Sequence, residues 1–524
     1  MSSVRIAQES ARGTFILLVG NVLSTAILTV ATIFIARLLG PDGYGVYTLA
    51  FVLPGLLIQF VGLGVNVAIT RYIAVHLSRG EVERARSVTR TATVFLFMFG
   101  VALSAVNFVV APAFVMAFMH RPELVSYVQL ASLWVLGVAL TQCVQSTFVG
   151  WVSMAEASGF SVLLAVLKLV LSVGLIVAGF GVYGAVVSHV AAYLVDGVVG
   201  VAALYALKLR GSKGEAGFYH DVRSMLGYGF PLFASQIASG LAAQYATIVL
   251  AAVASDAVVG YYATAINVTV AITVLSGALS TSLYRSFAAL EGLKEDVSLA
   301  FDYSVKYSSY ILTPLVFFLL VSARPLVDIL FGGSYAPTAG LLAIAAASFV
   351  PVAIGYLVLS PFFNGVGKSR LTLFISVIGA VVQAVGSYVL GDALGMGAVG
   401  VMVALVLSNV AITVSGLALA MDLLGTRLSV KPLLGILLSG CAAGLAVWLL
   451  PGTGLLSIEA LVLDSAVFLL LYATLVPLFS GVDENDLVRL SIAVQTMGPL
   501  RRLLEAFLGY ERRILRARGG APGG

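Results

Sequence analysis

Runs of about 20 apolar residues recur along nearly the whole chain and constrain its fold more than any other feature. Each run is long enough for one helix to cross the ~30 Å hydrocarbon core of a bilayer. The chain has 524 residues, of which 60% are hydrophobic and 10% are charged, whereas a soluble domain carries about 25% charged residues. The short alternating segments typical of outer-membrane barrels are absent from the sequence. The sequence therefore predicts an all-α polytopic membrane protein.

Glycine, proline or charged residues interrupt the apolar runs and divide them into fourteen predicted spans. The first run is too long for the apolar region of a signal peptide and lacks a small-residue cleavage pattern, so we interpret it as a retained helix. The division least marked by the sequence is the one at "GFGVYG", residues 179–184. The predicted spans are 14–36, 46–70, 91–118, 124–150, 158–179, 182–206, 226–253, 258–284, 306–331, 337–363, 371–391, 397–421, 431–450 and 458–479.

The positions of the basic residues predict the orientation of these spans. Cytoplasmic loops of membrane proteins carry an excess of Lys and Arg. With the N-terminus in the cytoplasm, all but four of the 29 Lys and Arg residues fall in the inner segments. The exceptions are Arg37, Arg121 and Arg324 outside and Lys168 within a span. We therefore predict that both termini are cytoplasmic.

Two copies of one motif indicate an internal duplication. "RLLGPDGYGVY" (37–47) and "AVASDAVVGYY" (252–262) place Gly45 and Tyr47 at the same spacing as Gly260 and Tyr262, 215 residues later. Further pairs keep this order at a similar offset, among them Arg71 with Arg285, Phe148 with Phe363, and Gly150 with Gly365. Each unit would hold six spans. Because six is an even number, both repeats cross the membrane in the same orientation. Such parallel repeats are related by a pseudo-two-fold axis along the membrane normal.

The duplication predicts four parts of the chain. Residues 1–210 form an N-terminal lobe of six spans, and residues 211–425 form a C-terminal lobe of six spans. Residues 426–480 add an extra helix pair, and residues 481–524 form a cytoplasmic tail. The tail is basic and amphipathic, so we expect it to lie on the anionic inner leaflet; the alternative is a solvent-exposed helix.

Four further stretches support a resemblance to a known family. They are "RLLGPDGYGVYTLA" (37–50), "GYGFPLFAS" (227–235), "DILFGGSYAPTAGLL" (328–342) and "FNGVGKSR" (363–370). The chain resembles the Wzx-type polysaccharide and oligosaccharide-lipid flippases of the multidrug/oligosaccharidyl-lipid/polysaccharide exporter superfamily. The resemblance covers spans one to twelve and extends to the fourteen spans of the lipid II flippases. Many relatives carry an Asp late in span seven, but residues 242–251 hold no acid, so a cation role is not carried over there.

Lys168 stands near the middle of the fifth predicted span, and Asp196 stands at similar depth in the sixth. A charged residue at that depth is costly and is expected to face a cavity or a partner. Lys168 would supply positive potential to a substrate cavity, with Asp196 as its charge partner. The alternative is a buried ion pair that only fixes the packing of the two helices. The equivalent position in the second repeat is Gln383, so only the first repeat carries a charge at this position.

Arg71 and Arg285 end the second and eighth predicted spans on the inner side, where the resembling family has its central cavity. Arginine binds phosphate oxygens in bidentate fashion, so we predict that both residues, with Arg37, bind substrate; the alternative is interfacial anchoring. Polar amides concentrate in the cavity helices of the family. Their alternative role is hydrogen bonding between helices, and they are Asn21, Gln59, Asn66, Gln236, Gln244 and Asn267.

The resemblance implies a flippase, not an enzyme, that moves a lipid-linked oligosaccharide from the inner to the outer leaflet by alternating access of two lobes. The alternative is a cation-coupled multidrug exporter of the same superfamily, and a polytopic glycosyltransferase ranks third because every predicted outer loop is short. The two cysteines form no metal pattern, and we expect no cofactor. Expected partners are the lipid-linked sugar, membrane lipids and H⁺ or Na⁺, without nucleic acid. We expect a monomer in the plasma (inner) membrane of a prokaryote.

Overall fold

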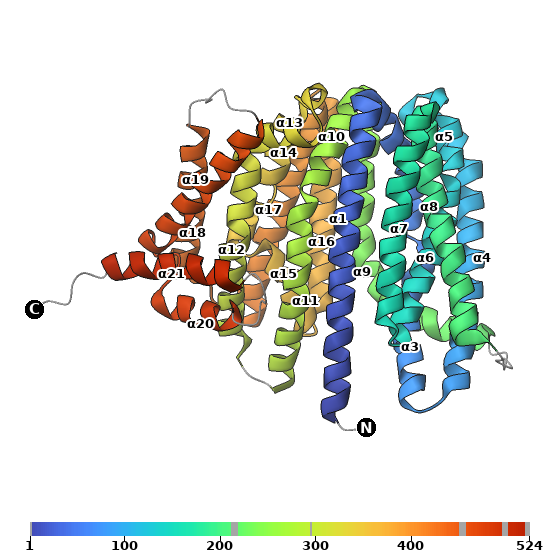
Figure 1. Cartoon of the computed structure of the whole chain (residues 1–524), viewed down its shortest axis with the longest axis horizontal. Helices are drawn as coiled ribbons and strands as arrows, with labels where there is room; N and C mark the ends of the chain where they lie inside the picture. The colour runs from blue at the N-terminus through green and yellow to red at the C-terminus, as the bar shows by residue number, and fades with distance from the viewer. Residues whose placement is uncertain (1–2, 211–217, 294–295, 450–456, 495–500, 519–524) are drawn as a thin grey trace, which may run out of the picture. The chain divides into compact units, whose positions relative to one another are not determined.

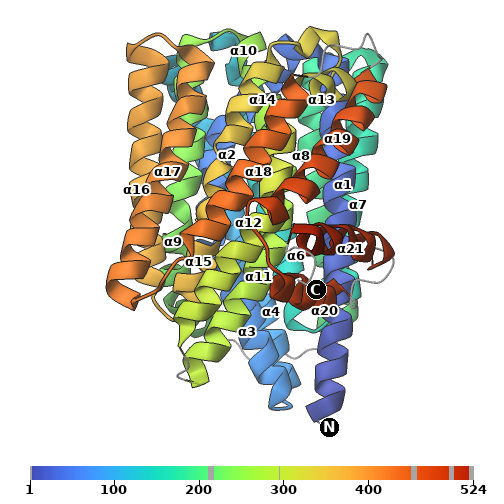
Figure 2. The same cartoon turned by 90° about the vertical axis from the view of Figure 1, so that its left-hand side faces the viewer.

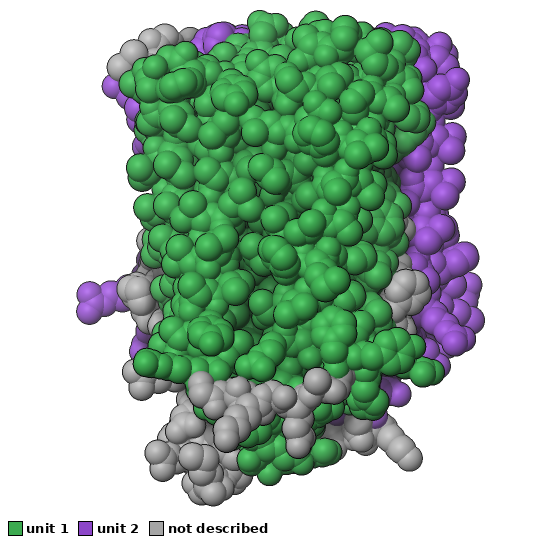
Figure 3. All heavy atoms as spheres, turned by 90° about the vertical axis from the view of Figure 1, so that its right-hand side faces the viewer, with its two compact units in different colours: residues 1–263 green, residues 264–524 purple. Residues whose placement is uncertain are grey.

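The structure is a computed structural model that describes residues 3–210, 218–293, 296–449, 457–494 and 501–518. Within these ranges every regular element is a helix, which confirms the all-α class predicted from the apolar runs. The described chain divides into two compact units, residues 1–263 and 264–524 (Figure 3).

Besides short 3₁₀ and π segments, the first unit contains nine α-helices among its described residues and the start of a tenth (Figure 1). They are α1 (Ser3–Ala50), α2 (Val52–Ile58), α3 (Val65–Ser78), α4 (Val82–Phe114), α5 (Val125–Leu130), α6 (Ser132–Gly150), α7 (Met154–Leu175), α8 (Gly181–Leu204), α9 (Phe218–Val253) and, running across the division, α10 (Asp256–Val268).

The second unit holds the remaining described helices, of which the last two come from the tail. They are α11 (Val270–Leu293), α12 (Val297–Val321), α13 (Ala323–Leu330), α14 (Thr338–Ala347), α15 (Tyr356–Gly365), α16 (Ser369–Gly386), α17 (Gly397–Leu424), α18 (Val430–Trp448), α19 (Ser457–Leu478), α20 (Glu484–Val494) and α21 (Arg501–Arg518).

Eleven stretches of the described chain are long and apolar enough to cross a membrane, or twelve if one bent pair counts as a single span. The predicted count of fourteen is therefore not confirmed. One reason is that some stretches are continuous: Met154–Leu209 contains the fifth and sixth predicted spans together. These two spans are nevertheless separate helices, α7 and α8, which pack against each other. The chain reverses between them at Gly179 and Gly181, whose φ angles are 92° and 52°. Positive φ is a conformation that glycine adopts readily.

The two copies of the duplicated motif contact each other within the first unit. A Cβ atom added to Gly45 would collide with the backbone carbonyl of Asp256, and a Cβ added to Gly260 would collide with that of Pro41. Pro41 and Asp256 are also 215 positions apart, so each copy presents its glycine to the same position of the other. Two copies of one surface related by a two-fold axis make this kind of reciprocal contact. It supports the duplication, which stays a prediction together with its membrane-normal axis.

The predicted lobe boundary at residues 210 and 211 assigns α9 to the second lobe by sequence repetition, whereas compactness groups α9 with the first unit. Backbone approaches explain this grouping. Gly64 precedes α3, and Gly229 lies in α9, and each is so close to the other's backbone that neither position has room for a Cβ atom. Lobes defined by duplication and units defined by packing therefore divide the chain at different places.

The predicted orientation can be tested by labelling single cysteines after Cys143 and Cys441 have been replaced by alanine. A cysteine at Ser78, the exposed end of α3, should react with a membrane-impermeant maleimide only after permeabilisation. A cysteine at Gly333, where a side chain meets open space, should react in intact cells. The reverse pattern would overturn the cytoplasmic placement of the termini. The predicted inner loop at residues 211–217 lies outside the described residues.

Candidate functional site

A cavity of about 330 Å³ lies where α3, α4 and α9 approach one another in the first unit. Basic and aromatic side chains dominate its lining. We refer to it as the α3–α9 cavity, and its lining residues are Arg71, Tyr72, Val75, His76, Arg79, Arg84, Val88, His220, Asp221, Ser224 and Met225.

The apolar pattern of α3 turns two arginines toward this cavity. Val65, Ile69 and Ile73 recur every four residues and are completely buried, in a cluster that also contains residues of α4, α6 and α9. A helix of 3.6 residues per turn then places Arg71 and Arg79, two turns apart, on a face beside the buried one. Both side chains are exposed and line the cavity.

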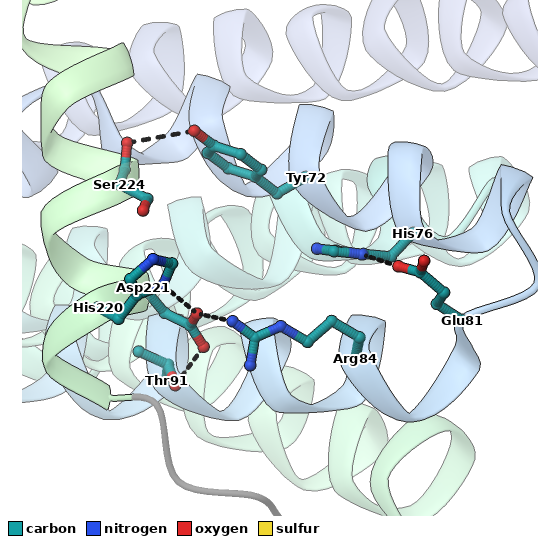
Figure 4. Close-up of polar contacts among 8 residues, drawn as sticks. All are labelled: Tyr72, His76, Glu81, Arg84, Thr91, His220, Asp221 and Ser224. Carbon is teal, nitrogen blue, oxygen red and sulfur yellow. Dashed lines mark hydrogen bonds and ion pairs between the residues drawn. The ribbon is translucent and has the colours of Figure 1, made fainter.

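Arg71 is held by aromatic rings. Its guanidinium carbon lies 4.2 Å from the ring centroid of Tyr228 and 5.8 Å from that of Tyr72, distances at which a cation is attracted to the ring face. The hydroxyl of Tyr72 donates a 3.3 Å hydrogen bond to the backbone carbonyl of Ser224 on α9 (Figure 4). This bond fixes the ring beside the arginine, so the guanidinium keeps its N–H donors for a ligand while its position is restrained.

Arg84 has a different role because its guanidinium group is paired with the buried carboxylate of Asp221. Asp221 is 4% exposed and accepts a 2.6 Å hydrogen bond from Arg84. The other carboxylate oxygen of Asp221 accepts from the hydroxyl of Thr91 at 3.5 Å, and Nδ1 of His220 lies 3.7 Å from the first (Figure 4). A buried charge is tolerated when it is paired and hydrogen-bonded in this way. Arg84 and Asp221 therefore join α4 to α9 as a structural pair.

The charge of the cavity is positive. Three arginines line it against the single carboxylate of Asp221. Nδ1 of His76 lies 2.6 Å from the Glu81 carboxylate (Figure 4). Since Arg84 is neutralised by Asp221, the charge available to a ligand resides mainly on Arg71 and Arg79. Such a cavity can bind an anion.

Lys168 and Asp196, predicted as a charge pair, are not joined in the structure. Lys168 lies half-buried on α7. Asp196 on α8 is completely buried, and neither of its carboxylate oxygens has a hydrogen-bond partner among the described residues. Lys168 does not line the α3–α9 cavity, so the structure does not bring it together with Arg71.

The predicted amides are distributed over several places. Gln59 and Gln244 lie close together: each side chain packs on a glycine of the other's helix segment, Gln59 on Gly240 and Gln244 on Gly55. Asn66 donates to the side-chain oxygen of Gln142, and Asn66 Oδ1 is buried without a partner among the described residues. Asn21 is exposed on α1 and Asn267 is half-buried on α10, and the side chain of Gln236 lies outside the described part of the chain.

The two remaining predicted arginines are exposed. Arg37 lies on α1 in the first unit, and Arg285 lies on α11 in the second. Of the four cationic residues predicted to bind substrate, Arg71 is the one that lines the α3–α9 cavity.

Arg79 and the polar partners around it are not among the residues predicted from the sequence. Arg79 could have been found from its spacing, because it follows Arg71 by two helical turns. Asp221 could not, since its partner Arg84 is 137 residues away and nothing local marks the pair. Among the described residues no cluster of three His, Cys, Asp or Glu side chains could hold a metal ion.

A family model described as "Polysaccharide biosynthesis protein" matches residues 34–340, which is more than half of the chain. The chain belongs to this family. The resemblance drawn from the motifs is thereby confirmed, and the protein is a multi-pass membrane transporter or flippase of polysaccharide biosynthesis. Apolar helices long enough to span a membrane fit this assignment.

One curated relative of this polysaccharide biosynthesis protein is the succinoglycan biosynthesis transport protein ExoT of Rhizobium meliloti (strain 1021). The two are 24% identical over 354 residues, which cover 66% of this chain and 67% of the relative. The lipid II flippase MurJ in an inward closed conformation is a similar solved structure, with a TM-score of 0.74 and 13% identity over 90% of this chain and all of that one. An inward-facing multidrug resistance MATE transporter of the MOP superfamily has a TM-score of 0.67 and 18% identity over 76% of this chain and 94% of that one. This chain therefore has the fold of that superfamily.

Proposed function

We propose that this protein is a flippase that moves a lipid-linked oligosaccharide, a sugar on a polyprenyl phosphate or diphosphate, from the inner to the outer leaflet for surface polysaccharide or glycoprotein biosynthesis. The observation that carries the proposal is the positive charge of the α3–α9 cavity. A phosphate group cannot enter an apolar membrane without compensation, because an unpaired ion in hydrocarbon is very costly. Cationic side chains along the entry supply that compensation.

The cavity suits the phosphates of the substrate and not its sugars. Ligand pockets commonly have volumes of about 300–1,000 Å³, and this cavity is at the lower limit of that range. Arg71 and Arg79 offer planar guanidinium groups that bind phosphate oxygens through two parallel hydrogen bonds. We infer that the headgroup binds there first, and that amides such as Gln59 and Gln244 meet sugar hydroxyls during transport by alternating access.

Lys168 extends this electrostatic path toward the middle of the membrane. A lysine at that depth requires water, a cavity or a counter-charge. Since Asp196 does not hold it in this structure, its charge is available, and we propose that it interacts with the substrate phosphates after they leave Arg71. We propose the same role for Arg285 in the other repeat.

A cation-coupled drug exporter of the same superfamily is the second candidate, and it is supported by the likeness to the MATE transporter. An exporter of cations would be expected to offer acidic side chains, whereas the one acid lining the α3–α9 cavity is neutralised by Arg84. The charge of the cavity therefore favours the flippase. Coupling to H⁺ or Na⁺, a monomeric state and an inner membrane with both termini cytoplasmic complete the proposal.

Reconstitution separates the two candidates. The protein is placed in liposomes that contain a fluorescent short-chain polyprenyl diphosphate sugar, and the fraction accessible to a quencher outside is followed over time. We expect accelerated leaflet exchange of this lipid and no accelerated efflux of an entrapped cationic dye. Efflux of the dye without exchange of the lipid would refute the flippase proposal and support the exporter.

A further inference from the structure

The tail of the chain folds back on the second unit and does not stand free. The structure places α21 crosswise to α18 and α19 (Figure 2), and Leu487 of α20 and Leu508 of α21 are buried in a core shared with α12, α18 and α19. Lys306, 7% exposed on α12, pairs with Asp486 at the start of α20.

Glu511 anchors α21 to the same surface. Its completely buried carboxyl group accepts a 2.7 Å hydrogen bond from Tyr310 of α12, and burial raises the pKa of Glu511 to about 8. The carboxyl is therefore mostly protonated at neutral pH, so the tail docks without burying a negative charge.

Two cavities that share Lys431 border α18, and the docked tail contributes to the lining of the first. The first, of about 730 Å³, has four basic side chains and two acidic ones in its lining, which consists of Lys306, Lys431, Pro432, Ser480, Val482, Asp483, Glu484, Leu515, Arg516 and Arg518. The second, of about 470 Å³, is apolar apart from the one basic residue that it shares with the first, and its lining consists of Val430, Lys431, Leu434, Gly435, Leu438 and Phe479.

The pairing of charges leaves two cations of the larger cavity without an acidic partner among the described residues. Asp486 and Asp483 lie within salt-bridge distance of Lys306, and Glu484 lies 3.7 Å from Arg516. Within the described ranges Lys431 has no ion pair, and Arg518 donates one N–H to the backbone carbonyl of Pro477 at 2.7 Å. Its other guanidinium N–H groups remain for a ligand. Lys431 and Arg518 carry two positive charges, and the second carboxylate beside Lys306 offsets one of them. The remaining charge suits one singly charged phosphate better than a diphosphate.

The apolar cavity continues directly from these cations. Val430, Leu434 and Leu438 recur every four residues along one face of α18 and are 57%, 49% and 53% exposed. The backbone of residues 479–481 approaches α18 at Gly435, which has no side chain. A Cβ atom added to Gly435 would lie only 2.8 Å from the amide nitrogen of Gly481. An amphiphile could thus place its phosphate beside Lys431 and a chain along α18.

We propose that the groove between α18 and α21 binds one phospholipid with a singly charged phosphodiester headgroup, of the phosphatidylglycerol type, with its phosphate on Lys431 and Arg518 and an acyl chain on Leu434 and Leu438. Lys431 begins a predicted span on its cytoplasmic side, so the lipid belongs to the inner leaflet. It holds the tail against the transmembrane helices. This site is separate from the α3–α9 cavity and independent of the transported substrate.

Lipid binding to the purified full chain tests the proposal by native mass spectrometry, with phosphatidylglycerol and phosphatidylcholine of matched chains as probes. A basic residue near an anionic lipid strengthens binding by about fivefold. Lys431→Gln/Arg518→Gln should therefore weaken phosphatidylglycerol binding by about 25-fold, whereas Arg512→Gln/Arg513→Gln, which removes the same charge from α21 outside the cavity lining, should change it by less than about twofold. Leu438→Trp should block the groove, and Leu445→Trp, farther along α18 and 56% exposed, should not.

Three outcomes would overturn the proposal. Equal weakening by the two charge variants would show diffuse attraction to an anionic surface. Equal binding of phosphatidylcholine, or full competition by inorganic phosphate, would remove the lipid specificity. Tighter binding of a polyprenyl diphosphate than of phosphatidylglycerol would assign the groove to the transport substrate. None of these measurements involves transport, so the lipid site and the proposed flippase can fail separately.

Discussion

Replacing Arg71 and Arg79 together by glutamine should slow leaflet exchange of a lipid-linked sugar by about 100-fold. Each arginine is expected to make a charge-assisted hydrogen bond to the phosphates, and one such bond is worth about 1.5–3 kcal/mol, or at least tenfold in rate. Arg84 is left intact because its removal would strand the buried Asp221. The rate is measured in the reconstituted exchange assay.

Arg223→Gln is the matched control. Arg223 lies on α9, exposed and only two residues after Asp221, yet it does not line the α3–α9 cavity, so the rate should stay within about twofold. Lys168→Ala and Arg285→Ala should each slow exchange if the electrostatic path continues beyond the entry. Normal transport by the Arg71/Arg79 variant, at unchanged protein level, would refute the role of the cavity.

Truncating Asp486 to alanine should destabilise the protein by about 3–5 kcal/mol, because the nearly buried ammonium of Lys306 would lose its buried partner and keep only the exposed carboxylate of Asp483, 3.9 Å away. The variant also loses the hydrogen bond that the carboxylate of Asp486 accepts from the Tyr307 hydroxyl and the one that it accepts from the backbone N–H of Asp483. The bond from the backbone N–H of residue 486 to the Asp483 carboxylate remains. Thermal unfolding in detergent measures the loss, and limited proteolysis shows whether α20 and α21 detach.

The compensating variant distinguishes an unpaired charge from general damage. Lys306→Met/Asp486→Leu should recover most of the stability, since an apolar pair of similar volume replaces a buried ion pair at little cost. Glu484→Ala, on the same helix but 62% exposed, should change stability by less than about 0.5 kcal/mol. A double variant as unstable as Asp486→Ala alone would contradict this account.

The class of fold was predictable because few backbone structures can span a bilayer. Apolar runs in lipid must form helices, since every backbone group needs an internal partner. The turn between α7 and α8 was the division least marked by the sequence, and its glycines, Gly179 and Gly181, were the signal for it. The number of spans was less predictable. Hydropathy sums composition over a window, whereas Thr338–Ile354 and Tyr356–Gly365 meet at a 52° bend that composition does not encode.

The candidate site was predictable only where local spacing carried the information. Arg71 stood out because it ends an apolar run and has a counterpart in Arg285. The partners that shape the cavity come from distant segments, as Arg84 and Asp221 show, and a single sequence contains no record of such pairs. The tail shows the same limit: its amphipathic pattern predicted a surface helix, but Glu511 reaches Tyr310 across 201 residues.

The reciprocal contact between the two glycine motifs bears on the ancestry of the chain. Gly45 meets Asp256 as Gly260 meets Pro41, which is how two identical subunits touch at the axis of a closed homodimer. The duplication that we propose would then have fused an interface that already existed, so the fused protein needed no new complementary surface. Fusion also freed each half to change alone. Lys168 in one half and Gln383 at the matching position of the other are a difference that a homodimer, encoded by one gene, could never have acquired.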